Sequence, residues 1–97
     1  MKVIYTGEAL DSLDGILAFI VTNYPTKSAA FEKRLRTVVM RIGAWPESAE
    51  EVAERPGVRV VPLIRYPDKV FYRVTSDAVE ILYIHHAARR APWERER

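Results

Sequence analysis

The chain has 97 residues, of which 48% are hydrophobic and 29% are charged, with a formal net charge of +2 and no cysteine. This length supports one domain over residues 1–97 with a single modest core, and it leaves no room for a second domain. The lack of cysteine excludes a disulfide framework, a thiolate metal site and a cysteine nucleophile, and it is typical of a cytoplasmic protein.

Basic residues are concentrated in the second part of the sequence. Residues 1–57 hold seven Lys/Arg and eight Asp/Glu, whereas residues 58–97 hold eight Lys/Arg and five Asp/Glu. The small net charge does not by itself indicate a nucleic-acid-binding protein, so direct nucleic-acid binding stays open. Residues 1–15 contain neither an apolar signal core nor a membrane-spanning segment. We therefore expect a soluble cytoplasmic protein with no membrane partner.

Two amphipathic helices are predicted after a short first strand. Residues 1–5 are β-branched and aromatic, and Thr6 is placed to cap a helix that Pro25 ends. A second helix runs from about Lys27 to a natural stop at Gly43. The apolar residues recur at spacings of three and four, as Leu10, Leu13, Leu17, Ile20, Val21 and Tyr24 and then as Phe31, Leu35, Val38, Val39 and Ile42. The short turn between the helices predicts an antiparallel helical hairpin.

Beyond the second helix the periodicity becomes that of strands. Residues 44–57 are a connector, in which Ser48–Glu51 has the spacing of a capping box and predicts two turns of helix. An antiparallel meander is predicted over residues 58–65, 69–74 and 79–86. Pro62 has no amide hydrogen for a ladder, so its strand should lie at an edge or be bulged there. The last strand is apolar on both faces and should be central.

The predicted fold class is therefore α+β, in the order β-α-α-β-β-β. A helical hairpin packs on a small antiparallel sheet in one domain, and residues 92–97 form a frayed tail.

Five arginines lie in or near the predicted strands: Arg59, Arg65, Arg73, Arg89 and Arg90. Spread over a solvated sheet face, they would be ordinary surface charges. Gathered at one sheet edge, their guanidinium groups would suit bidentate contact with phosphate or with the carboxylates of a partner. Charge alone does not choose between these two ligands.

The two histidines are adjacent, and Trp93 follows Pro92 in the tail. Neighbouring strand residues point to opposite faces, so at most one of His85 and His86 joins a given site. A His-His pair without carboxylates at ligand spacing does not make a metal site, and no pattern indicates a cofactor. Trp93 either folds back onto the domain or anchors an interface.

Three segments carry a family resemblance when they are taken together and in this order. They are NYPTKSAAFEKRL (23–35), RYPDKVFYRV (65–74) and VEILYIHHAARRAPW (79–93). The chain resembles the ParE/RelE superfamily of toxins from bacterial type II toxin-antitoxin systems, and it is more similar to the ParE branch. The resemblance implies a small bacterial protein that causes growth arrest when free, as in plasmid stabilization, and is held inactive by an antitoxin encoded beside it.

Similarity to the ParE branch implies a non-catalytic inhibitor of DNA gyrase that stalls cleavage complexes and blocks replication. We expect Arg89, Arg90 and Trp93 to contact this target, because a desolvated arginine or tryptophan can dominate an interface. The resemblance also implies a ParD-like antitoxin in a hetero-oligomeric complex. An amphipathic helix and an extended tail of this antitoxin should cover the hairpin and the sheet edge, with acidic side chains meeting arginines. The expected contacts are Leu13, Leu17, Phe31, Leu35, Arg59, Arg65 and Arg73.

Similarity to the RelE branch implies the alternative, an endoribonuclease that cuts mRNA on the ribosome. Attack by a 2′-hydroxyl needs a general base, a cation for the charge on the phosphorus and a general acid. Candidates for these roles are Arg59, Arg73, His85 and His86, but no lysine-rich stretch lies in 58–65 and no tyrosine follows His86. The incomplete set favours a binding protein over an enzyme, and an inactive partner-binding subunit is a third interpretation.

Overall fold

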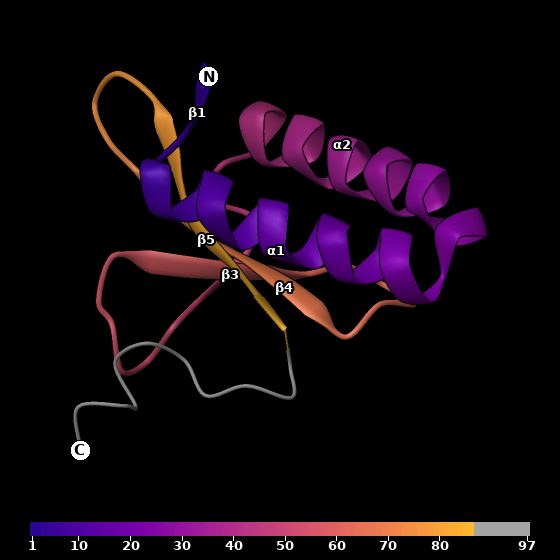
Figure 1. The fold of residues 1–97 in the computed structure, drawn as a ribbon. Coiled ribbons are helices and arrows are strands. Elements are labelled where there is room, and N and C mark those ends of the chain that lie inside the picture. Colours follow the sequence, from indigo (N-terminus) through magenta and orange to yellow (C-terminus); the bar gives the residue numbers. More distant parts are fainter. Residues whose placement is uncertain (87–97) are drawn as a thin grey trace.

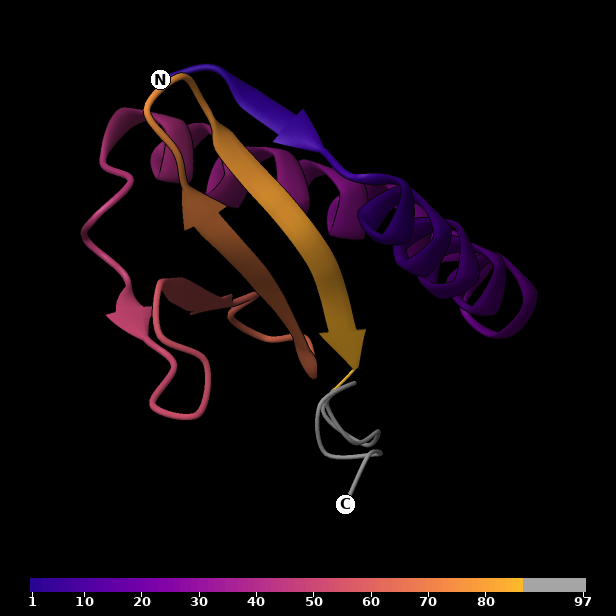
Figure 2. The same cartoon turned by 90° about the vertical axis from the view of Figure 1, so that its left-hand side faces the viewer.

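The computed structural model describes residues 1–86, in which two helices lie on the same side of a five-stranded sheet (Figures 1 and 2). The elements are β1 (Val3–Tyr5), α1 (Gly7–Asn23), the 3-10 turn η1 (Pro25–Lys27), α2 (Ser28–Ala44), β2 (Glu50–Glu51), β3 (Val58–Pro62), β4 (Asp68–Val74) and β5 (Val79–His86). The predicted α+β class and the predicted helical hairpin are confirmed. The predicted tail at 92–97 lies outside the described residues.

The sheet has the strand order β1-β5-β4-β3-β2. Strands β3, β4 and β5 form the predicted antiparallel meander. The middle strand is β4 rather than β5, which lies between β4 and the short edge strand β1. The sheet is mixed rather than wholly antiparallel, because β1 pairs parallel to β5, with Val3 opposite Val79 and Tyr5 opposite Ile81. No tight turn joins these two strands, so no hairpin geometry fixes their relative direction.

Thr6 caps α1 and also fastens it to the sheet. Its hydroxyl oxygen accepts a hydrogen bond from the amide of Ala9 at 3.1 Å, which confirms the predicted cap. The same hydroxyl lies within hydrogen-bonding distance of the carbonyls of Ile81 (2.9 Å) and Leu82 (3.0 Å) as a donor. The start of α1 is thereby held against β5.

Gly43 does not end the second helix, which continues to Ala44. A Cβ atom on this buried glycine would lie 3.1 Å from the carbonyl oxygen of Met1 and 3.1 Å from Cγ2 of Val3. Close packing of the N-terminal segment against α2, rather than a left-handed helix cap, therefore explains the glycine.

The predicted helix at Ser48–Glu51 is wrong, because Glu50–Glu51 form the short strand β2. The guanidinium of Arg59 donates to the carbonyls of Glu47 (3.1 Å) and Ala49 (2.6 Å). The hydroxyl of Tyr72 donates to the carbonyl of Pro46 at 2.6 Å. These long-range bonds hold the connector extended and override its local capping-box pattern.

The core lies between the helices and the sheet. Its most buried members are Ala9 and Ile20 of α1, Phe31, Leu35, Val38 and Ile42 of α2, Leu63, and Val70, Tyr72, Val79, Ile81 and Ile84 of the sheet. Each helix therefore covers the same face, and the opposite face of the sheet carries Phe71 and Tyr83, whose rings stack at 4.7 Å.

Pro62 and Leu82 mark the two irregular places in the sheet. The strand of Pro62 is not the predicted edge strand, because β2 lies beside β3. β2 pairs only with Arg59 and Val60, so Pro62 ends β3 beyond the part that β2 covers and does not interrupt that ladder. The register shift lies elsewhere, between Phe71 paired with Tyr83 and Tyr72 paired with Ile81, which leaves Leu82 as the extra residue of a bulge in β5. Ile81 and Ile84 can therefore both face the helices.

Candidate functional site

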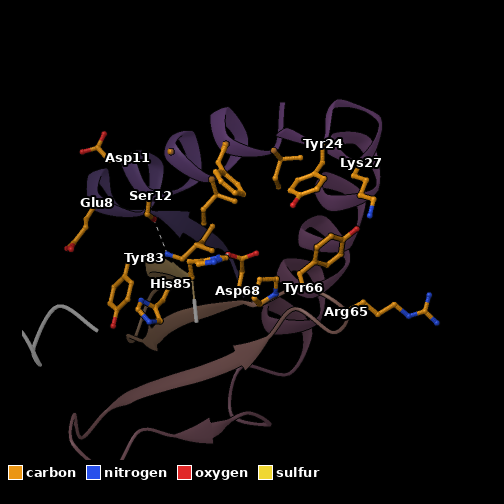
Figure 3. Close-up of a pocket in the computed structure, with 17 residues that line it drawn as sticks. Glu8, Asp11, Ser12, Tyr24, Lys27, Arg65, Tyr66, Asp68, Tyr83 and His85 are labelled. Carbon is orange, nitrogen blue, oxygen red and sulfur yellow. Dashed lines mark hydrogen bonds and ion pairs between the residues drawn. The ribbon is translucent and has the colours of Figure 1, made fainter. Parts of the chain in front are cut away.

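A cleft of about 750 Å³ opens between α1 and the end of β5 (Figure 3). This volume is within the usual range of ligand-binding pockets, roughly 300–1,000 Å³. The cleft is lined by Glu8, Asp11, Ser12, Gly15, Ile16, Phe19, Ile20 and Tyr24 from α1 and its C-cap, by Lys27, and by Arg65, Tyr66, Pro67, Asp68, Tyr83, Ile84, His85 and His86.

The edge of β5 becomes available here because β1 pairs with β5 only as far as Ile81. Ser12 of α1 meets this edge, and its hydroxyl oxygen accepts a hydrogen bond from the amide of Ile84 at 2.9 Å. The same hydroxyl donates to the carbonyl of Ala9 at 2.9 Å. The oxygen of Ser12 therefore links α1 to β5, while its proton is engaged within α1.

Asp68 and His86 form a polar pair in the cleft. Oδ1 of Asp68 lies 3.1 Å from Nδ1 of His86, and Asp68 is only 4% exposed. The His86 ring also lies 6.5 Å from the ring of Phe19, centroid to centroid. A buried carboxylate that accepts from one ring nitrogen fixes the orientation of the imidazole.

The charged residues of the cleft are divided by sign. Glu8 and Asp11 lie at the end where α1 begins, whereas Lys27 and Arg65 lie at the opposite end (Figure 3). Lys27 is near Tyr24, with its ammonium 5.6 Å from the ring centroid. Arg65 adopts a left-handed backbone conformation, with φ at 78°. Each end therefore presents one sign of charge to anything that lies along the cleft.

Exposed aromatic side chains lie between these ends. Phe19 and Tyr24 are 54% and 52% exposed, and their ring centroids are 6.3 Å apart. Large aromatic residues that remain this open on a small domain are typical anchors of protein interfaces.

The histidines lie on opposite faces of β5, as expected from their adjacent positions. His86 faces the helices and pairs with Asp68. His85 lies on the other face, where its ring is 6.1 Å from that of Phe71 and 6.4 Å from that of Tyr83.

Of the two arrangements considered for the arginines, spread or gathered at one sheet edge, the described residues show the spread one. Arg59 is directed to the connector carbonyls on the helix side of the sheet. Arg73 lies on the opposite face, where its Nε is 2.6 Å from the carboxylate of Glu80. Arg65 lies in the loop before β4, at the cleft. Arg89, Arg90 and Trp93 are outside the described residues.

The four nuclease candidates are also separated. Arg73 and His85 share one face of the sheet. Arg59 and His86 share the other face, but they lie on β3 and β5, which β4 separates. Arg73 is four residues along β4 from Lys69, the partner of His85. This spacing corresponds to about 13 Å. A general base and a charge-stabilising cation must both reach the same reacting phosphate, so these two side chains are too far apart to act together.

The expected antitoxin contacts divide between core and surface. Phe31 is fully buried and Leu35 is 6% exposed, so both belong to the core and offer a partner no surface. This corrects the expectation for α2. Leu13 and Leu17 of α1 are partly buried against the core. The apolar side chains of α1 that are open are Leu10, Phe19 and Val21, together with Tyr24 at its C-cap.

Two tyrosines of the structural core have perturbed ionisation. Burial raises the pKa of Tyr72, an effect that the positive charge of Arg59 partly opposes. Burial also raises the pKa of Tyr5. Neither residue lines the cleft.

Residues 1–86 include no helix that is long and apolar enough to cross a membrane. The same part of the chain has no group of three or more His, Asp or Glu side chains that could hold a metal ion.

A helical hairpin on one face of a small mixed sheet, with an open cleft beside α1, defines a small α+β domain of the ParE/RelE type. The model of the family described as "ParE toxin of type II toxin-antitoxin system, parDE" matches residues 3–91. The chain belongs to this family of toxins. Its structure is similar to a chain of the chromosomal ParDE toxin-antitoxin system from P. aeruginosa, with a TM-score of 0.77 and 27% identity over 89% of this chain and 95% of that chain. No curated protein matches the sequence.

Several cleft residues were not singled out from the sequence: Glu8, Asp11, Gly15, Phe19, Lys27 and Asp68. They come from segments far apart in the chain, so no local motif contains them. One local signal was available, because Gly15 interrupts an otherwise good helical pattern without a turn to explain it.

Proposed function

We propose that this ParE-family toxin arrests bacterial growth by inhibiting DNA gyrase and that a cognate ParD-like antitoxin neutralises it. Family membership supports the toxin class. The separation of Arg73 from His85 along the sheet supports binding over RNA cleavage, because a nuclease would need these groups together. Both proposed partners act in the cytoplasm, where we place the toxin.

Target binding is assigned to Arg89, Arg90 and Trp93, which follow β5 in sequence. Arginine and tryptophan are the residue types most enriched among energetically dominant interface contacts. Changing Arg89 and Arg90 together to Ala should relieve toxicity while the free energy of unfolding changes by less than about 1 kcal/mol. Arg36 and Arg41, two exposed arginines on α2, provide a matched double-alanine control that should remain toxic.

The mechanism is tested by inducing the toxin without antitoxin and measuring DNA breaks and mRNA cuts in the same culture. Gyrase-dependent breaks with intact mRNA are expected, and a resistant gyrase variant should restore growth. Translation-dependent mRNA cleavage with intact DNA would contradict the proposal and would direct attention to Arg73 and His85. Absence of toxicity would favour a partner-binding subunit.

We assign antitoxin binding to the exposed apolar side chains of α1 and its C-cap. Leu10, Phe19, Val21 and Tyr24 are each at least half exposed, which is a large apolar area for a chain of this size. The protein encoded beside this chain should co-purify with it and raise its thermal stability by mass action. An isolated toxin that binds no adjacent-gene product in a pull-down would contradict this assignment.

A further inference from the structure

We propose that Asp68 and His86 form a positioning pair for target binding, because they fix the end of β5 from which Arg89, Arg90 and Trp93 reach the target. This inference rests on the proposed role of those three residues and adds two residues that act through them. Asp68 and His86 themselves are assigned no contact with the target.

The pair closes the last rung of the ladder between β4 and β5. Asp68 is the first residue of β4 and lies opposite His86, the last residue of β5. Oδ1 of Asp68 is 3.1 Å from Nδ1 of His86. Pairing is weakest where a strand ends. A side-chain bond at this rung therefore restrains the last residue of β5 where the ladder gives it the least support.

Asp68 is the rigid member of the pair. It is 4% exposed, and its backbone carbonyl accepts a hydrogen bond from the amide of Leu63 at 2.9 Å. Leu63 is itself fully buried in the core. The carboxylate therefore has a fixed position, and the more exposed side chain of His86 (34%) is held to it.

Stability of the fold does not account for an ionisable pair at this place. Removing a carboxylate from water is costly, and apolar side chains of similar volume are often as stable as a buried ion pair or more so. A hydrogen-bonded pair adds direction instead, because donor and acceptor must meet within a narrow range of distance and angle. The pair is therefore suited to set the orientation of His86 at the end of its strand.

A second polar pair between the same strands provides a comparison. Arg73 and Glu80 lie opposite each other near the other end of the ladder, with 2.6 Å between Nε and the carboxylate. Their side chains are 55% and 28% exposed, so this ion pair is solvated and contributes little. The buried pair lies instead at the end of β5 from which the chain continues to Arg89.

Arg89 is close enough along the chain to depend on this restraint. It is three residues beyond His86, and a fully extended chain spans only about 3.5 Å per residue, so the two backbones are within about 11 Å of each other. A change in the position of His86 is carried to Arg89 and Arg90 over this short distance. Binding groups must be held within about 0.5 Å of their productive geometry. Loss of the pair should therefore weaken target binding.

The first test removes the pair without leaving a buried charge, in the full-length toxin. Asp68→Val combined with His86→Phe introduces apolar side chains and keeps a ring beside Phe19, whose centroid is 6.5 Å from that of His86. This variant should be folded by circular dichroism and melt within about 5 °C of the wild type, yet inhibit purified gyrase roughly tenfold less well. Glu80→Gln removes the exposed ion pair of the same ladder. It is the matched control and should change inhibition less than about twofold.

The second test separates direction from packing and does not depend on the double variant being folded. In His86→Asn the amide nitrogen is at the δ position, as Nδ1 is, whereas in His86→Gln it is one bond further from the backbone. His86→Asn should retain inhibition within about threefold, and His86→Gln should lose roughly as much as the apolar pair. Equal inhibition by these two variants would show that the position of the donor is irrelevant and would overturn the inference.

A double-mutant cycle tests whether the pair acts through the arginines. Once Arg89 and Arg90 are replaced by alanine, Asp68→Val with His86→Phe should reduce inhibition by less than about a further twofold. Losses that multiply independently would mean that the pair acts elsewhere, and they would overturn the positioning role.

Growth arrest in cells separates this inference from the proposed target. If the wild-type toxin arrests growth without inhibiting gyrase, the proposed target is wrong, and growth arrest replaces gyrase inhibition as the measure for the same variants. If folded Asp68→Val with His86→Phe arrests growth as strongly as the wild type, the positioning role is overturned, whichever target is involved. If Arg89→Ala with Arg90→Ala remains fully toxic, the proposed role of those arginines fails and this inference fails with it.

Discussion

The two helices of the hairpin have the same length but different roles. Each has 17 residues, and α2 has five charged side chains where α1 has three. The less charged helix is nevertheless the less buried one. α2 buries Phe31, Leu35, Val38, Ile42 and Gly43, whereas α1 buries only Ala9 and Ile20.

This difference indicates that α1 contributes both to the core and to an exposed apolar surface. One side of α1 joins the core through Ala9 and Ile20, and its outer sides keep Leu10, Phe19 and Val21 exposed. A helix whose apolar residues exceed what its own core covers is suited to a partner, while α2 supplies stability to the isolated chain.

The largest expected contrast is between two phenylalanines. Phe31→Ala in α2 should cost about 3–5 kcal/mol of unfolding free energy, because the side chain is fully buried. Phe19→Ala in α1 should change it by less than about 1 kcal/mol, because more than half of that side chain is in water already. Urea unfolding of both variants gives the comparison. Equal losses would show that α1 is as structural as α2.

The glycines of the two helices should also differ. Gly15→Ala in α1 should stabilise the isolated chain by about 0.5–1 kcal/mol, because it improves helix propensity in open space. Gly43→Ala in α2 should be less favourable by about 1 kcal/mol, since the added methyl would press on Met1 and Val3. Thermal unfolding of the two variants side by side decides this. A stabilising effect that is equal at both sites would contradict the close packing at Gly43.

Substitution of Arg65 should change stability and binding in opposite directions, and by smaller amounts than the substitutions above. Arg65→Gly relieves a left-handed residue and should stabilise the isolated toxin by a few tenths to about 1 kcal/mol, part of the gain being offset by unfolded-state entropy. The same change should weaken binding of the adjacent-gene product. If Arg65→Gly binds with unchanged affinity, Arg65 does not contribute to binding, whatever the stability of the variant.

The smallest expected effect is a loss of stability at alkaline pH. It comes from two tyrosines, Tyr5 and Tyr72, on the face of the sheet that the helices cover. Burial raises the pKa of Tyr5 and Tyr72 in the folded state above that of the unfolded chain. The unfolded chain therefore loses its tyrosine protons first, and stability should fall as the pH rises above about 10. Thermal unfolding between pH 8 and about 11 should show a shallower decline for Tyr5→Phe than for the wild type. An identical decline in Tyr5→Phe and the wild type would show that ionisation of Tyr5 does not cause the loss of stability.

Most of the fold follows from local patterns. Threefold and fourfold spacing of apolar residues defines both helices, and the hydroxyl of Thr6 caps the first one as its position predicts. The connector was not predictable in the same way, because the bonds from Arg59 and Tyr72 that extend it come from strands later in the chain. Long-range hydrogen bonds decided its conformation against a local helix signal.

The site was less predictable for a related reason. Periodicity identifies apolar residues but does not reveal which of two apolar helices the core covers, and so Phe31 and Leu35 were expected at the surface. Strand alternation separated His85 from His86 correctly. It did not reveal the bulge at Leu82, because the residues on both faces of β5 are apolar there. The cleft itself exists only where α1, Arg65 and the end of β5 meet.

Hydrogen exchange measured by mass spectrometry, on the full-length toxin with and without the protein encoded beside it, tests the division between the helices most directly. The account predicts slower exchange in the complex over residues 8–24 and 65–68, with the exchange of α2 unchanged because its amides already belong to the stable core. Slower exchange confined to α2, or a complex that leaves residues 8–24 unaffected, would contradict it.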